Sequence, residues 1–212
     1  MIKPVFFIDD DEFERRSSTD VLNEVFKGTG IYVESLPPLP KLTDYAGFLA
    51  EERASALILD ERLNTTGGVT YTGAELAAHL RKIGGKLPIV ILTNFPDDDD
   101  VFSRLGWAVE NVVSKKRVLK DPASPMALEF KARLARQIET AGVVLAEREK
   151  RFHDLLVKSL KESLTPEEEK ELGLLEVERV LPMQAEELSD AKSLQKAIAE
   201  LKAKLAPDEL KL

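Results

Sequence analysis

The 212-residue sequence contains no cysteine, few aromatic residues and no long hydrophobic run. Without cysteine the chain can form neither a disulfide framework nor a thiolate metal site. Its longest apolar runs, such as 88–92, are far shorter than the about 20 residues of a membrane-spanning helix. The first eight residues lead directly into acidic residues and lack the features of a secretory signal. These absences predict a soluble, cytoplasmic protein with no membrane partner.

The sequence also lacks an excess of basic residues. It has 30 Lys and Arg against 38 Asp and Glu, a formal net charge of −8, and residues 125–212 hold 15 basic against 18 acidic residues. Proteins that bind a nucleic-acid backbone usually carry a basic surface. The composition therefore disfavours nucleic acid as a partner.

In the first 120 residues, short apolar runs rich in β-branched residues alternate with amphipathic stretches. This alternation is typical of a parallel sheet with helices on both faces. The runs at 5–8, 56–59 and 89–92 are unbroken, as expected of central strands. We predict a doubly wound α/β fold with strands near 4–9, 30–35, 55–60, 88–93 and 109–114, and helices near 12–27, 42–53, 73–84 and 98–105.

The C-terminal region carries only helical patterns. A long helix is predicted from Ala127 to Leu164, with Gly142 as a bend between a part that covers the sheet and a part that meets another helix. A second helix is predicted to start at Thr165 and end before Pro182, and a last one to start at Ser189. The predicted apolar stripe of the long helix consists of Phe130, Leu134, Ile138, Ala141, Leu145, Phe152, Leu155 and Leu156.

Polar residues stand where the predicted strands end. The carboxyl ends of the strands in a doubly wound sheet converge on one crevice. Carboxylates gathered there would repel one another unless a hard cation such as Mg²⁺ neutralised them, and a carboxylate beside the cation could then attack a phosphoryl group. A hydroxyl and an ammonium could donate to the phosphoryl oxygens. The residues at these ends are Asp9, Asp10, Asp11, Asp60, Thr93 and Lys115.

Five segments in this order resemble the receiver domain of two-component response regulators, over roughly residues 1–140. Each segment alone is a weak signal, but their order and spacing together are specific. The segments are Phe6-Phe7-Ile8-Asp9-Asp10-Asp11, Leu57-Ile58-Leu59-Asp60, Thr72-Gly73-Ala74-Glu75-Leu76, Leu87-Pro88-Ile89-Val90-Ile91-Leu92-Thr93 and Val112-Val113-Ser114-Lys115.

The resemblance implies a flavodoxin-like strand order, 2-1-3-4-5, and a role for each residue at the strand ends. Asp60 would accept the phosphoryl group, with Thr93 and Lys115 contacting it. The metal ligands would be Asp9, Asp10 (the more direct of that pair), Asp60 and the carbonyl of Arg62. A histidine kinase or phosphotransfer protein would donate the phosphate, and the chain would be a signalling switch rather than an enzyme.

We expect the receiver domain to span 1–140, and the helical region 141–212 to bind a downstream protein or form a homodimer, including by coiled-coil contacts. Four features depart from the family's usual pattern: Asn94, Val112, Lys116 and the long loop from Glu61 to Tyr71. They leave open a degenerate receiver that acts as a phosphate-independent scaffold, and a DNA-binding regulator is a further alternative. A phosphatase ranks last, because Arg62 stands where such enzymes commonly carry a second acid.

Overall fold

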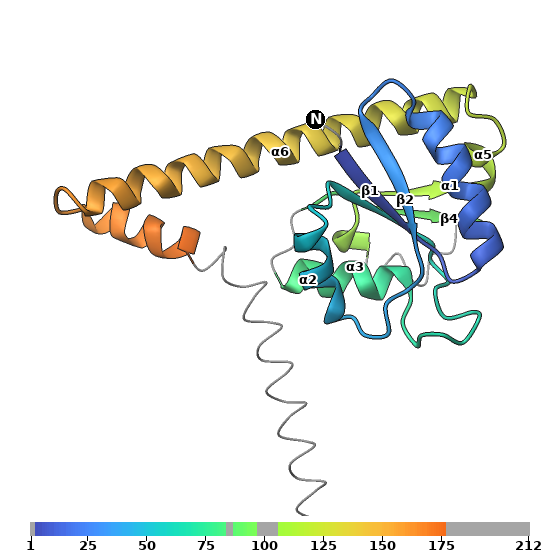
Figure 1. The fold of residues 1–212 in the computed structure, drawn as a ribbon, viewed down its shortest axis with the longest axis horizontal. Coiled ribbons are helices and arrows are strands. Elements are labelled where there is room, and N and C mark those ends of the chain that lie inside the picture. The colour runs from blue at the N-terminus through green and yellow to red at the C-terminus, as the bar shows by residue number, and fades with distance from the viewer. Residues whose placement is uncertain (1–2, 84–86, 97–105, 177–212) are drawn as a thin grey trace, which may run out of the picture.

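A computed structural model describes residues 3–83, 87–96 and 106–176. It contains one five-stranded parallel sheet in the order β2-β1-β3-β4-β5 with helices on both faces (Figure 1). The predicted flavodoxin-like α/β fold is therefore confirmed. Among the helices of the described residues, none is both long enough and apolar enough to cross a bilayer.

Each strand lies within two residues of its predicted position. Of the three central strands, β3 and β4 are buried along their whole length and β1 is buried over its last four residues, since helices cover both faces of the sheet. The strands are β1 (Lys3–Ile8), β2 (Ile31–Leu36), β3 (Ala56–Leu59), β4 (Ile89–Thr93) and β5 (Asn111–Ser114).

Two apolar cores fill the space between the sheet and its helices. One face is covered by α1 (Glu12–Phe26), α5 (Lys115–Leu119) and the first part of α6 (Pro125–Ser159), which contribute buried residues including Leu22, Phe26, Val118, Phe130, Leu134 and Ile138. The other face is covered by α2 (Asp44–Glu51), α3 (Gly73–Lys82) and η1 (Gly106–Ala108), which contribute Tyr45, Leu49, Leu76, Leu80 and Ala108.

Local capping chemistry explains where the main helices begin. The side chain of Asp11 accepts a hydrogen bond from the Glu14 amide at the start of α1. Thr72 and Glu75 form a reciprocal capping box at the start of α3. Ser124 caps α6, whose first residue is a proline that needs no partner for an amide hydrogen.

The structure corrects three details of the predicted helices. The short helix α5 follows β5 directly and was not predicted, because five residues are too few to show a helical period. The long helix begins at Pro125 and ends at Ser159 instead of spanning 127–164, and it continues through Gly142 as one helix. The helix predicted at 98–105 lies outside the described residues, as do the predicted helix end at Pro182 and the start at Ser189.

The second half of α6 projects from the α/β domain and meets a second helix, 166–176, which runs back along it (Figure 1). The predicted start at Thr165 is confirmed, since Thr165 and Glu168 exchange capping hydrogen bonds. Leu155 is buried in this pair of helices, and Arg151 and Lys158 form ion pairs with Glu171 and Glu168.

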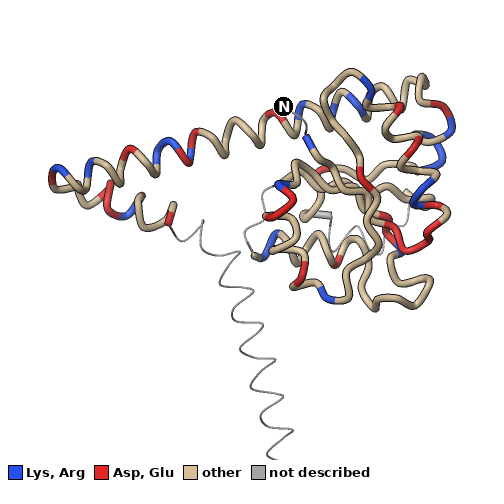
Figure 2. The backbone as a smooth tube through the Cα atoms, viewed as in Figure 1, with Lys and Arg blue, Asp and Glu red and all other residues tan. Residues whose placement is uncertain are grey.

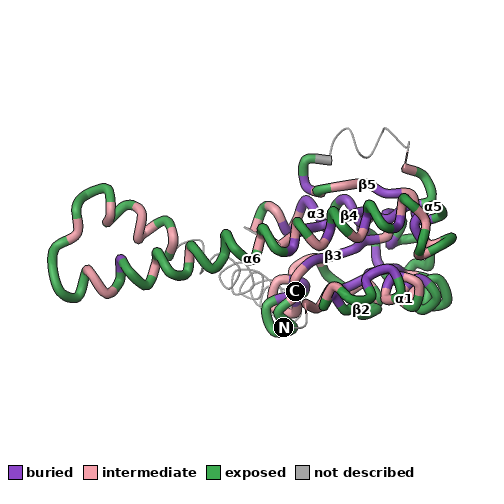
Figure 3. Tube along the Cα trace, turned by 90° about the horizontal axis from the view of Figure 1, so that it is seen from above, coloured by how far each residue is buried: buried purple, intermediate pink, exposed green. Residues whose placement is uncertain are grey.

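Burial along the predicted apolar stripe of α6 is uneven. Phe130, Leu134 and Ile138 are buried against the sheet, as predicted. Leu145 and Leu156 are exposed instead, with 62% and 41% of their surface accessible. Figure 3 shows the projecting part as mostly exposed, because the stripe continues beyond the sheet that its first part covers.

Candidate functional site

Lys115 joins two of the predicted carboxylates at the carboxyl edge of the sheet. Its Nζ lies 2.6 Å from Asp9 Oδ2 and 3.4 Å from Asp60 Oδ1. Glu14, at the start of α1, lies 3.7 Å from the same ammonium. A buried lysine, 5% exposed, thus contacts the carboxylates of the residues that directly follow β1 and β3.

Strand register explains why these three residues meet. Ile8 pairs with Leu59 across β1 and β3, so Asp9 and Asp60 leave the sheet side by side. Thr93 pairs with Ser114 across β4 and β5, so Lys115 enters the same edge one residue later. Figure 2 shows the acidic stretch after β1 in red at this edge.

Burial and charge act in opposite directions on the groups of this cluster. Burial raises the pKa of Asp60, and although the charge of Lys115 lowers it, the net shift is upward. Burial alone would lower the pKa of Lys115, but the hydrogen bond with Asp9 and the neighbouring carboxylates raise it overall. The ammonium therefore stays charged and acts as an internal counter-ion for Asp9 and Asp60.

Asp10 points its carboxylate to the long loop after β3. Its Oδ2 accepts a hydrogen bond of 2.6 Å from the amide of Thr66. The neighbouring Thr65 donates its hydroxyl to the carbonyl oxygen of Arg62 at 3.0 Å. Two predicted metal ligands, the Asp10 carboxylate and the Arg62 carbonyl, are thus both contacted by the tip of one loop.

Thr93 is buried at the end of β4, and its Oγ1 accepts a hydrogen bond from the amide of Phe95. The Arg62 guanidinium lies 4.2 Å above the Phe95 ring, while the Arg62 amide donates to Asp60 Oδ2. The Arg62–Phe95 contact thus connects the segment after Asp60 with the segment after Thr93.

The donor set suits a magnesium ion. In the described residues, no group of three or more Asp, Glu, His or Cys side chains could hold a metal. Both oxygens of Asp9 accept hydrogen bonds, from the Asp11 amide and from Lys115, and both oxygens of Asp60 do so from Lys115 and the Arg62 amide. Lys115 lies closer to Asp9 than to Asp60, at 2.6 Å against 3.4 Å, so Asp10, Asp60 and the Arg62 carbonyl are the better placed oxygen donors. Mg²⁺ commonly binds one or two carboxylates while keeping several waters.

Sequence reasoning missed the residues that support this edge. Glu61 is buried and accepts from the amide of Ala74, and burial raises the pKa of Glu61 to about 7. Arg15 donates to the carbonyl of Asp9, and Thr66 reaches Asp10. The length of the loop was the only signal in the sequence, because these contacts join segments with no shared motif.

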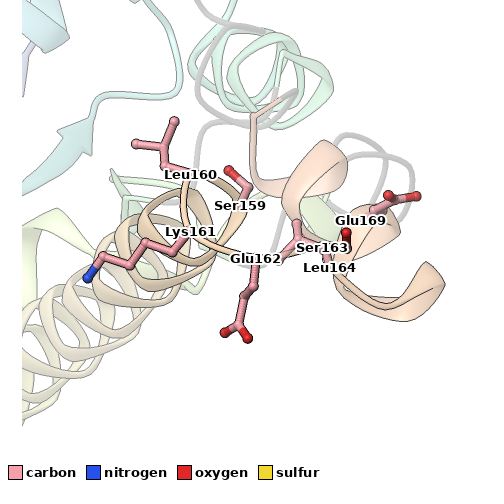
Figure 4. Close-up of a pocket in the computed structure, with 7 residues that line it drawn as sticks. All are labelled: Ser159, Leu160, Lys161, Glu162, Ser163, Leu164 and Glu169. Carbon is pink, nitrogen blue, oxygen red and sulfur yellow. The ribbon is translucent and has the colours of Figure 1, made fainter.

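The hollow between α6 and the helix 166–176 does not form a second site. Figure 4 shows it at the turn between the helices, with the Lys161 and Glu162 side chains directed outward. Except for the half-buried Leu164, its lining residues are exposed, so the hollow would not exclude water from a ligand. It is lined by Ser159, Leu160, Lys161, Glu162, Ser163, Leu164 and Glu169.

No protein-family model matches the chain, and no curated protein matches it. The chain is similar to the solved structure of a LuxR-family DNA-binding response regulator from Staphylococcus aureus, at 18% identity over 66% of this chain and 98% of that one, with a TM-score of 0.46. It is also similar to the receiver domain of a LuxO repressor protein from Vibrio parahaemolyticus, at 15% identity over 68% of this chain and 95% of that one, with a TM-score of 0.49.

A third similar structure is a CheY-like receiver domain protein from Methanospirillum hungatei, at 18% identity over 66% of this chain and 99% of that one, with a TM-score of 0.46. At these identities the likeness concerns the fold. Many of the similar solved structures are receiver domains of response regulators, and the C-terminal helical region is unassigned.

Proposed function

We propose that this protein is a two-component response regulator that is phosphorylated on Asp60 in a Mg²⁺-dependent reaction. The observation that carries the proposal is the buried ammonium of Lys115, which contacts both Asp9 and Asp60. It adds a positive group beside the reactive carboxylate, where an incoming phosphoryl group needs one.

In the proposed reaction a carboxylate oxygen of Asp60 forms a bond to the phosphorus of a phosphohistidine. The bond from phosphorus to the donor nitrogen breaks, and the histidine leaves with the electron pair. Asp10, Asp60 and the Arg62 carbonyl would hold Mg²⁺, which supplies charge neutralisation for the phosphoryl oxygens. Lys115 would move its hydrogen bonds from the carboxylates to the phosphoryl group, and the Thr93 hydroxyl would donate to the same group.

The chain would act as a switch with slow self-dephosphorylation and not as a turnover enzyme. A histidine kinase or phosphotransfer protein would supply the phosphate. The helical region, α6 and the helix 166–176, would transmit the change by binding a downstream protein or a second copy of the chain. Charges of both signs alternate along this region (Figure 2), which supports a protein partner over nucleic acid.

Incubation with acetyl phosphate and Mg²⁺, followed by a phosphate-affinity gel, tests the proposal. We expect a shifted band in the wild type that disappears with chelator and in Asp60→Asn. The matched control, Asp20→Asn, changes an exposed carboxylate of α1 and should shift like the wild type. A wild type that never shifts would point to the phosphate-independent scaffold, and a phosphorylation-dependent shift of a DNA probe to the DNA-binding regulator.

A further inference from the structure

The loop from Glu61 to Tyr71 is firmly attached at its base. The amide of Gly73 donates to the Glu61 carbonyl, and the amide of Ala74 donates to the Glu61 side chain. Leu63, Val69 and Tyr71 are buried in the core beneath α2 and α3. Both ends of the loop are therefore anchored to the core by buried apolar side chains.

The tip of the loop, residues 64–68, is exposed and turns back over the carboxyl edge of the sheet. Gly67 has a positive φ of 80°, which lets the chain reverse immediately after Thr66. This turn directs the Thr66 amide to Asp10 Oδ2 and the Thr65 hydroxyl to the Arg62 carbonyl.

These two hydrogen bonds leave room for a cation at the same groups. A carboxylate has two oxygens and a carbonyl oxygen has two lone pairs. The Thr66 amide uses one oxygen of Asp10, and the Thr65 hydroxyl uses one acceptor position of Arg62. Hydrogen bonds of this kind hold metal ligands in orientation. Their removal commonly lowers metal affinity by about 10–100-fold.

We propose that Thr65 and Thr66 are positioning residues for the Mg²⁺ site: they orient the Arg62 carbonyl and the Asp10 carboxylate and so couple the order of the loop tip to metal binding. This inference rests on the proposed function, since it requires a cation between Asp10, Asp60 and Arg62. The coupling is reciprocal, so Mg²⁺ also stabilises the loop tip.

Calorimetric titration of the full chain with Mg²⁺ tests the two donors separately. Thr65→Val removes a hydroxyl at nearly constant shape, and Thr66→Pro removes the amide hydrogen. Each should weaken Mg²⁺ binding by about 10-fold. The matched controls Thr65→Ser and Thr66→Ser keep both the hydroxyl and the amide at each position, including the Thr66 hydroxyl that donates to the Asp10 carbonyl, and their affinity should equal that of the wild type.

Hydrogen exchange provides a second readout on the unmodified chain. Mg²⁺ should slow the exchange of the Thr66 amide, because a ligand that fixes Asp10 also fixes its partner. Faster exchange with Mg²⁺, or tighter Mg²⁺ binding in Thr65→Val and Thr66→Pro, would show that the loop competes with the cation and would overturn the inference.

The two proposals fail in different ways. Equal Mg²⁺ affinity in the wild type, Thr65→Val and Thr66→Pro overturns the positioning role and leaves the proposed phosphorylation standing. A wild type that binds no Mg²⁺ overturns both.

Discussion

Among the residues that the structure describes, Lys115 is one of three charged residues that are buried, with Asp9 and Glu61. Its surroundings explain why it tolerates burial. Its ammonium has carboxylate partners at the ends of two strands, Asp9 after β1 and Asp60 after β3, within 3.4 Å. Removal of one partner from a buried charge cluster usually costs about 3–5 kcal/mol, because the remaining charges are left without compensation.

Lys115→Met should therefore lower the free energy of unfolding by a few kcal/mol in chelator, as measured by urea denaturation. Mg²⁺ should restore more stability to this variant than to the wild type, since the cation replaces the lost positive charge between the carboxylates. Lys116→Met is the control, because Lys116 is exposed and its removal should leave the transition unchanged. Equal unfolding curves for both variants would show that Lys115 is not the counter-ion of this cluster.

At the scale of elements, the junction between β3 and α3 is tightly packed. A Cβ atom on Gly73 would lie 2.3 Å from the carbonyl oxygen of Asp60. No real contact is this short, so any larger residue must displace either α3 or the backbone that presents Asp60.

Gly73→Ala should lower the free energy of unfolding by about 1–3 kcal/mol, the usual cost of overpacking, and should slow phosphorylation of Asp60. Gly142→Ala is a matched control in α6, where an added Cβ meets nothing within 4 Å. This control should gain about 0.5–1 kcal/mol, since alanine favours the helix. Urea denaturation measures the stability, and a phosphate-affinity gel measures the phosphorylation. A Gly73→Ala variant as stable as the wild type would contradict the packing argument.

The pair formed by α6 and the helix 166–176 depends on one buried leucine more than on its surface ion pairs. Leu155 is 1% exposed, whereas the adjacent Leu156 is 41% exposed. Leu155→Ala should remove about 2–5 kcal/mol of packing and speed hydrogen exchange over 151–176. Leu156→Ala should have little effect on that exchange, and similar exchange in both variants would mean that the two helices are not held together by this contact.

At the scale of the whole molecule, α6 links the sheet to the helix 166–176 as one continuous element (Figure 1). A displacement at the sheet edge can therefore reach the projecting end without crossing a flexible linker. Val143, Val144 and Leu145 are exposed on the part between them, which suits a surface that is covered on association.

Light scattering of the full chain with Mg²⁺ and beryllofluoride tests this transmission. We expect the mass to rise from one chain to two, because the bound phosphoryl analogue would favour the state in which the exposed residues of α6 are covered. Asp60→Asn should keep the one-chain mass under the same conditions. If both proteins keep one mass throughout, the helical region signals without assembly.

The fold and its reactive edge were accessible from the sequence because both depend on local patterns. Buried parallel strands are continuous apolar runs, and the residues that follow them must meet at one edge, which is how Asp9, Asp60 and Lys115 could be named together. The short helix α5 and the exposure of Leu145 were not accessible, since five residues carry no period and an apolar residue does not reveal where its covering sheet ends.

The sequence by itself therefore determined where the strands lie and which chemical groups follow them, because strand periodicity constrains both, while the strand order followed from the resemblance to receiver domains. Only the tertiary structure decided that Lys115 is the shared counter-ion of two carboxylates, and that the tip of the Glu61–Tyr71 loop contacts Asp10 and the Arg62 carbonyl. The physical reason is that these contacts depend on loop geometry and side-chain direction between residues up to 106 positions apart, which no local pattern encodes.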